Sequence, residues 1–265
     1  MKKFGLIGHP IARSLSPVLF NAAYEGKYPY DLIQGDDFEV SYQKFLDEYD
    51  GINVTAPFKE QAFAKADILS EECRLAKAAN ILVKTPEGVK AYNSDLLGVR
   101  LWIREVLQGV GTGSGMTALI VGCGGAGRAT ALAAASLGLR TVLMNRNIDR
   151  AKNLEEDLRS MGYEAETQPM DGFATWFRRS DIIIYNIPTA IPQISTLTDS
   201  DFAPGHPKFI LEANYKDPSF DEACLSRMPH VRYTGGRTWL LYQAMTGYEI
   251  FTGEKPDLEK MSAVL

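Results

Sequence analysis

One stretch of the chain restricts its fold more than any other, a short apolar run followed by closely spaced glycines. Residues 118–121 read Ala-Leu-Ile-Val, which suits a strand buried in a parallel sheet. Gly122, Gly124 and Gly127 follow with the spacing G-x-G-x-x-G, and an alanine-rich stretch and a second apolar run come next. This order predicts a strand, a tight turn, a helix and a second strand.

The glycine spacing is typical of a dinucleotide-binding turn. The first glycine makes the turn, the second lets the backbone approach a pyrophosphate, and the third lets the helix pack closely. The helix start, with Gly125 and Ala126, would supply free amides and a positive dipole. A glycine-rich turn that binds nothing is the alternative, but the flanking strand and helix favour the nucleotide.

The end of the second strand bears on which dinucleotide binds. A site for NAD usually carries Asp or Glu about 20 residues past the glycines, where it binds the ribose 2′-hydroxyl. This chain has Asn145 followed by Arg146. Because no carboxylate repels a 2′-phosphate and a guanidinium is available to pair with it, NADP is favoured. A solvated Arg146 is the alternative interpretation.

The 265 residues exceed the usual size of one domain, so we expect two. Strand-like and helical runs alternate in the first hundred residues, which favours an α/β layer structure. The glycine-rich stretch 108–115 is the candidate domain junction, although a long surface turn would look the same. The predicted fold class is α/β with two domains, an N-terminal α/β domain and a Rossmann-type doubly wound nucleotide domain. The predicted bounds are 1–110 plus 238–265, which returns as helices, and 111–237.

Composition excludes several classes of function. The formal net charge is −5 and no Lys/Arg-rich run appears, so we expect no nucleic-acid partner. No stretch approaches a membrane span, and the apolar run at the N-terminus is too short for a signal peptide. Cys73, Cys123 and Cys224 lack the spacing of a metal site or disulfide framework. We expect a cytoplasmic protein with reduced thiols and no metal.

Polar side chains gather around the stretch GINVTAPFKE, residues 51–60. Pro57 disfavours helical geometry in the residue before it, so Asn53, Thr55 and Lys59 are expected to project from the mouth of a sheet. An ordinary strand-to-helix turn with a surface lysine is the alternative.

Three further segments carry candidate polar residues. Asp95 stands at the start of the predicted helix 95–107, where it or Ser94 would also serve as an N-cap. Asn80 lies at the mouth of another predicted strand. Ser14 and Ser16 lie on a loop before a helix, which they would equally well cap.

Taken together, these segments resemble shikimate dehydrogenases. The resemblance rests on the serine loop, NVTAPFK, AAN, NSDLLG, the glycine fingerprint, NR and LLYQA, in this order. It implies reversible reduction of 3-dehydroshikimate to shikimate with NADPH, on a substrate domain joined to a nucleotide domain. The positions that match the family's substrate site are Ser14, Ser16, Asn53, Thr55, Lys59, Asn80, Asp95, Tyr215 and Gln243. Those that match its cofactor site are Gly122, Gly124, Gly125, Ala126, Gly127, Asn145, Arg146, Pro188, Gly236 and Trp239.

The residue chemistry agrees with this implied reaction. A hydride that arrives at a ketone carbon leaves negative charge on the oxygen, which needs a proton donor. We predict that Lys59 donates this proton and that Asp95 orients the ammonium. The hypothesis requires the two side chains to meet in the fold.

The chain departs from the family pattern at several positions. Arg13 and Phe20 stand where histidines are common, and Trp239 replaces a methionine near the nicotinamide. Residues 185–191 read Tyr-Asn-Ile-Pro-Thr-Ala-Ile where the family often has Asn-Ala-Thr-x-x-Gly-Met, and Tyr215 begins a segment with one extra residue.

The alternatives are a quinate-accepting dehydrogenase that uses NAD, a ligand sensor of the same fold, and a nicotinamide enzyme acting on a folate-like substrate. The expected partners are small molecules, with the protein as a monomer or homodimer.

Overall fold

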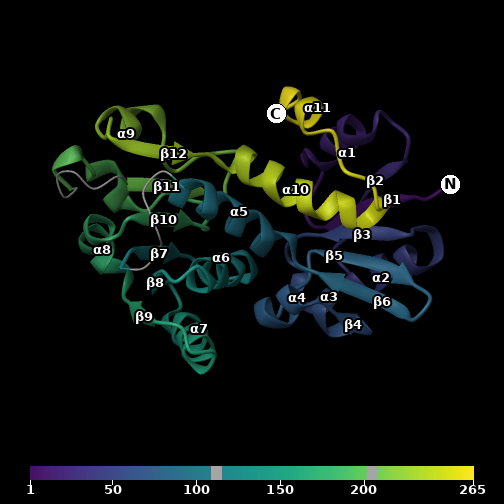
Figure 1. The fold of residues 1–265 in the computed structure, drawn as a ribbon, viewed down its shortest axis with the longest axis horizontal. Coiled ribbons are helices and arrows are strands. Elements are labelled where there is room, and N and C mark those ends of the chain that lie inside the picture. Colours follow the sequence, from purple (N-terminus) through teal and green to yellow (C-terminus); the bar gives the residue numbers. More distant parts are fainter. Residues whose placement is uncertain (109–114, 202–207) are drawn as a thin grey trace. The chain divides into compact units, whose positions relative to one another are not determined.

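Two long helices, α5 (Ser94–Gln108) and α10 (Gly236–Thr252), run through both of the units into which the chain divides. The computed structural model describes residues 1–108, 115–201 and 208–265, and its units are 1–98 with 241–265, and 99–240 (Figure 1). The boundaries thus fall inside helices. The sequence analysis placed them at 110 and 237, and most of the glycine-rich candidate junction, residues 109–114, lies outside the described residues.

The two halves of α5 have different partners. In the first unit, Gly98 lies so close to α10 that a Cβ added there would be 2.8 Å from Gln243 N. In the second unit, Trp102 Nε1 donates a hydrogen bond to Thr234 Oγ1 over 3.0 Å. A single helix therefore contributes to two packed bodies, which sequence periodicity alone does not indicate.

The first unit contains a mixed sheet with the strand order β2-β1-β3-β5-β6-β4. β1 pairs in parallel with β2 and β3, whereas β5 is antiparallel to β3 and β6. The elements are β1 (Phe4–Gly8), α1 (Ser16–Tyr24), β2 (Tyr30–Gln34), α2 (Phe38–Glu48), β3 (Gly51–Val54), α3 (Lys59–Lys65), β4 (Ile68–Leu69), α4 (Glu71–Ala76), β5 (Ile81–Thr85), β6 (Gly88–Tyr92) and α11 (Leu258–Ala263).

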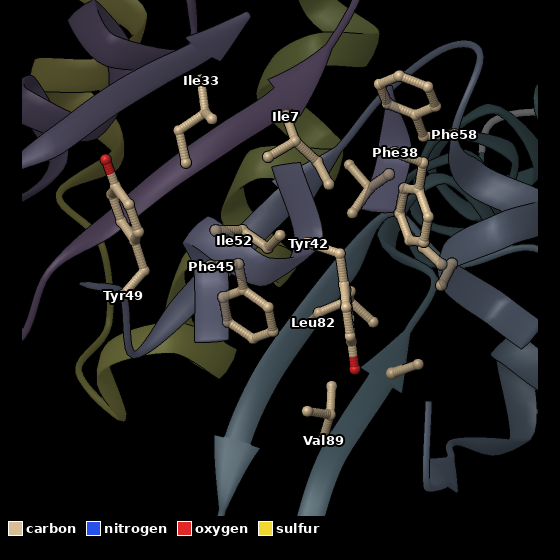
Figure 2. Packing of buried hydrophobic residues seen from close by; sticks show 14 of the residues in the cluster. Ile7, Ile33, Phe38, Tyr42, Phe45, Tyr49, Ile52, Phe58, Leu82 and Val89 are labelled. Atoms are coloured by element: carbon tan, nitrogen blue, oxygen red, sulfur yellow. The ribbon is translucent and has the colours of Figure 1, made fainter. Parts of the chain in front are cut away.

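Each face of this sheet has its own apolar cover. On one face, Ile52 and other strand residues pack with aromatic side chains of α2, such as Phe45 (Figure 2). On the opposite face, Phe4 stacks on Phe251 of α10 with ring centroids 5.1 Å apart. Gly51 also lies against Phe251, and strand alternation places Asn53 on that same face. Asn53 is thus directed away from the α2 core.

The second unit contains a parallel sheet with the order β12-β11-β10-β7-β8-β9. This is the doubly wound order, and it confirms the predicted fold class. The chain reverses its direction of winding between β7 and β10, and ligands of such sheets bind at the carboxyl ends of the strands there. The elements are β7 (Thr117–Val121), α6 (Gly125–Ser136), β8 (Arg140–Met144), α7 (Ile148–Ser160), β9 (Ala165–Gln168), α8 (Phe173–Arg179), β10 (Ile182–Tyr185), β11 (Lys208–Glu212), α9 (Glu222–Ser226) and β12 (Val231–Thr234).

Within the described residues, no helix has the length and apolar character to cross a membrane. The same residues contain no group of three or more His, Cys, Asp or Glu side chains arranged to hold a metal ion. Cys73, Cys123 and Cys224 are free and buried.

Candidate active site

Lys59 and Asp95, the predicted acid/base pair, meet in the first unit. Lys59 is the first residue of α3, Asp95 is the second residue of α5, and Lys59 Nζ donates to Asp95 Oδ2 over 2.5 Å. The Asp95 side chain is only 3% exposed, whereas that of Lys59 is 18% exposed. A buried carboxylate therefore holds an ammonium that is still accessible, which is the arrangement a proton donor needs.

The start of α5 explains how Asp95 becomes available to Lys59. Asn93, not Ser94 or Asp95, caps the helix, because its Oδ1 accepts a hydrogen bond from Leu96 N over 3.1 Å. Asn93 Nδ2 donates to the Ala78 carbonyl over 2.8 Å, which ties the cap to the segment before β5. The N-cap interpretation of Asp95 is therefore wrong. The sequence could have indicated the cap at Asn93, since asparagine is a preferred residue at the N-cap position of helices.

Asn80 braces the same helix start. Its Oδ1 accepts from Ser94 N over 2.8 Å, and its Nδ2 donates to Ser94 Oγ over 3.0 Å. The backbone of Asn80 also accepts from Val54 N over 2.8 Å. Asn80 thus links the end of β3 to α5. These bonds use only one of the two hydrogens on Asn80 Nδ2.

The serine loop is closed by bonds between its own residues. Ser14 Oγ donates to Ser16 Oγ over 3.1 Å, and Ser16 N donates to Ser14 Oγ over 3.3 Å. The residue before α1 is Leu15, and no side chain caps that helix within the described residues. The Ser16 carbonyl accepts from the Tyr248 hydroxyl of α10 over 3.1 Å. The serine hydroxyls therefore do not serve as helix caps, which leaves them to other partners.

Asn53 and Thr55 stand at the end of β3. Asn53 Oδ1 accepts from the Tyr30 hydroxyl over 2.6 Å, and Asn53 Nδ2 lies 3.4 Å from the Asn80 carbonyl. Thr55 N donates to the Ile7 carbonyl over 3.0 Å, which holds the turn before α3 against β1. Within the first unit, a hydrogen bond thus connects the predicted residues Asn53 and Asn80. Tyr30 belongs to the same hydrogen-bonded group, and sequence reasoning missed it.

Gln243 lies on α10 in the same unit. The close approach of Gly98 to its backbone requires a residue without Cβ on α5. Gly247, one turn further along α10, lies against the first residue of α5, because a Cβ there would be 3.2 Å from Ser94 Oγ. Two glycines therefore let α5 and α10 approach closely beside the helix start that carries Asp95.

The three fingerprint glycines have the geometry that a dinucleotide requires. Gly122 has φ +93°, which favours glycine, and a Cβ on Gly127 would be 1.8 Å from the Gly122 carbonyl oxygen. A Cβ on Gly124 comes within 4 Å of no described atom. Gly124 precedes α6, whose first residues are Gly125 and Ala126, so the helix start has no side-chain cap. The open surface beside free amides fits a pyrophosphate.

The residues after β8 fit the ribose end of such a ligand. Asn145 Oδ1 accepts from Cys123 N over 3.0 Å, and Asn145 Nδ2 donates to the Asn147 carbonyl over 2.8 Å. Asn145 thus joins the glycine turn to the start of α7, where the Asn147 side chain is the cap. The Arg146 side chain is exposed beside them, available to a phosphate.

The loop after β10, which departs from the family pattern, is held by contacts of its own. The buried Tyr185 donates to the Thr189 carbonyl over 2.7 Å, and Asn214 Nδ2 donates to the Pro188 carbonyl over 3.0 Å. Ile187 packs on the glycine turn, since a Cβ on Gly122 would be 2.7 Å from its Cγ2. The loops after β7, β10 and β11 are therefore joined at the carboxyl ends of neighbouring strands.

Among the buried polar atoms that lack a hydrogen-bond partner within the described residues, one lies on the loop after β10 and one on α10. They are Asn186 Oδ1 and Trp239 Nε1. Asn186 Nδ2 donates to Thr130 Oγ1 over 3.1 Å, so the orphan oxygen belongs to a side chain fixed beside α6. Unpaired buried polar groups are costly, and a ligand or water is the usual explanation.

The last two predicted positions also lie in the second unit. Tyr215 is half-buried in the segment after β11. Gly236 begins α10, and a Cβ there would be 2.4 Å from the Ala213 carbonyl oxygen. Gly236 thus lets the start of α10 pack against the segment that leads to Tyr215.

Comparisons with known proteins cover most of the chain. Residues 6–82 match the model of the shikimate dehydrogenase substrate binding domain, and residues 105–200 match that of shikimate / quinate 5-dehydrogenase. The shikimate dehydrogenase (NADP(+)) of Acinetobacter baumannii strain AYE is 32% identical over 267 residues, which span 97% of this chain and 98% of that protein.

Solved structures agree with this match. The Mycobacterium tuberculosis shikimate dehydrogenase is similar with TM-score 0.82 and 29% identity, over 100% of this chain and 98% of that one. The shikimate 5-dehydrogenase of Thermus thermophilus, in complex with NADP(H) and shikimate, is similar with TM-score 0.80 and 25% identity, over 100% and 98% of the two chains.

Proposed function

This chain belongs to the shikimate dehydrogenase family, and we propose that it catalyses the reversible, NADP-dependent reduction of 3-dehydroshikimate to shikimate. The observation that carries the proposal is the 2.5 Å contact between Lys59 Nζ and Asp95 Oδ2. A redox reaction between a ketone and an alcohol needs a proton at the oxygen as well as a hydride at the carbon. This pair is suited to supply the proton.

The division of chemistry follows from the residues. NADPH supplies the hydride to the carbonyl carbon when it is bound. Lys59 donates a proton to the carbonyl oxygen as negative charge develops there, and it accepts that proton from the alcohol in the reverse direction. Asp95 keeps the ammonium oriented through their ion pair, and the Asp95 carboxylate is itself buried.

The substrate needs donors for its carboxylate and both donors and acceptors for its hydroxyls. The Ser14, Ser16 and Thr55 hydroxyls are suited to the carboxylate and hydroxyls. The Gln243 amide can donate and accept at once, and the Asn53 amide retains a hydrogen to donate. Asn80 contributes through its remaining amide hydrogen. Residues 1–110 with 238–265 would form the substrate domain, and residues 111–237 the nucleotide domain.

The nucleotide residues support NADP in particular. The open surface at Gly124 and the amides at the start of α6 fit the pyrophosphate. Asn145 and Arg146 fit a 2′-phosphate, because the first is neutral and the second is cationic and exposed. Pro188, Gly236 and Trp239 would complete the nicotinamide end, whereas Tyr215 would bind the substrate. We expect the enzyme to act in the cytoplasm as a monomer or homodimer.

A turnover assay tests this proposal. Nicotinamide absorbance is followed with shikimate or quinate as the alcohol, each with NADP or NAD, on the purified protein. We expect the highest kcat/KM for shikimate with NADP. Preference for quinate with NAD would move the protein to the quinate-using branch, and binding of NADP without turnover of either alcohol would identify a sensor.

A further inference from the structure

Tyr30 of β2 lies among the polar residues assigned above to the substrate, although no sequence motif singles it out. Its hydroxyl donates to Asn53 Oδ1 over 2.6 Å. The neighbouring Tyr248 ring packs on Tyr30 and its hydroxyl donates to the Ser16 carbonyl over 3.1 Å, so Tyr30 lies between the serine loop and Asn53.

Packing holds the Tyr30 ring independently of any ligand. Its centroid lies 4.7 Å from that of Phe20 and 6.3 Å from that of Tyr248. Burial raises the pKa of the Tyr30 hydroxyl well above its usual value, so the hydroxyl keeps its proton throughout the working pH range. A neutral phenol in a fixed position thus always has one proton to donate.

That proton decides which way the Asn53 amide faces. An asparagine side chain accepts at Oδ1 and donates at Nδ2. With Oδ1 paired to the Tyr30 hydroxyl, Nδ2 is directed toward the Asn80 carbonyl, 3.4 Å away, and retains a second hydrogen for another acceptor. A reversed amide would place Oδ1 against the Asn80 carbonyl, where two acceptors cannot pair, and would take the acceptor away from the Tyr30 proton. Asn53 therefore directs its remaining Nδ2 hydrogen, a donor, toward a neighbouring ligand, while its oxygen faces Tyr30.

We propose that Tyr30 is a positioning residue of the substrate site, which fixes the Asn53 amide as a hydrogen-bond donor and so selects a ligand that presents an accepting oxygen there. This inference rests on the proposed function, because it takes the ligand of Asn53 to be the hydroxy acid. Tyr30 acts through Asn53 and takes no part in the proton transfer itself.

Kinetics of Tyr30→Phe, which keeps the ring and removes the proton, test the inference. We expect kcat/KM for shikimate to fall about tenfold, mainly through KM, since the half-buried Asn53 amide oxygen loses its partner. In the Asn53→Ala background the same change should cost less than twofold. Tyr24→Phe is the matched control, because Tyr24 belongs to the same aromatic cluster but donates to the Glu254 carbonyl. An equal loss from Tyr30→Phe in both backgrounds, or a loss no greater than the control's, overturns the inference.

A second readout needs no turnover. The side-chain amide signals of Asn53 in the ligand-free protein are assigned by nuclear magnetic resonance through their disappearance in Asn53→Ala. They should shift in Tyr30→Phe and stay unchanged in Tyr24→Phe, and unchanged signals in both variants overturn the inference. Absence of shikimate turnover by the wild-type protein would instead contradict the proposed function, and the amide signals would still decide whether Tyr30 fixes Asn53.

Discussion

Gly124→Ala separates nucleotide binding from stability. The new Cβ would come within 4 Å of no described atom, and the backbone of Gly124, at φ −76° and ψ −167°, is accessible to alanine. The free energy of unfolding should therefore change by less than about 0.5 kcal/mol, as for substitutions that touch nothing. The protein should fold and melt as the wild type does.

The affinity for NADP should fall in the same variant. The methyl group occupies the open surface beside the α6 amides, where the second glycine of the fingerprint lets the backbone approach the pyrophosphate. Displacing a phosphate from one or two charge-assisted hydrogen bonds costs about 1.5–3 kcal/mol, which raises the Kd about 10- to 100-fold. The affinity for shikimate alone should stay unchanged, since Gly124 belongs to the other unit.

Titration calorimetry with NADP and thermal unfolding measure the two effects. Gly172→Ala is the control, because its Cβ would make ordinary contacts of 3.6 and 3.7 Å far along the chain from the fingerprint. Gly127→Ala should differ from Gly124→Ala by losing stability, since its Cβ would lie 1.8 Å from a carbonyl oxygen. An unchanged Kd for NADP in Gly124→Ala would refute the assignment of this surface to the pyrophosphate.

Three further predictions concern the rest of the molecule. Lys59→Met should lower the free energy of unfolding by about 3 kcal/mol, because it leaves the buried Asp95 carboxylate unpaired. The double variant Lys59→Met/Asp95→Asn should recover most of that stability but remain inactive. A double variant as unstable as the single one in thermal unfolding contradicts the account. Asn93→Ala should lower the free energy of unfolding by about 1 kcal/mol through loss of the α5 cap, and denaturant titration that finds no change would exclude that capping role. Burial raises the pKa of the Cys123 thiol to about 12, so the thiol stays protonated at pH 8. It should therefore react with a thiol reagent far more slowly in the folded than in the unfolded protein, and equal rates would show that the thiol is exposed.

The sequence predicted the parts of the fold that depend on local pattern. The strand, glycine turn and helix of residues 117–136 follow from an apolar run and three glycines whose conformations allow few alternatives. The contact between Lys59 and Asp95 was predicted from the resemblance, and no local pattern would have indicated it, because the residues are separated by three strands and a helix.

Tyr30 shows why the remainder was not predicted. Its partner Asn53 lies on β3, and β1 separates that strand from β2 in the sheet. Strand order and register decide such a contact, and a single sequence does not give either. The capping role of Asn93 could have been predicted from the sequence, since asparagine is a preferred N-cap residue and Asn93 directly precedes the helix.

The most direct test of the central claim compares binding with turnover in Lys59→Met. Titration calorimetry gives the Kd for shikimate, and the NADP-linked assay gives kcat at saturating substrate. If Lys59 transfers the proton, the Kd should change less than about threefold while kcat falls about 10²- to 10⁴-fold. Losses of similar size in both quantities would make Lys59 a binding residue and contradict the proposed chemistry.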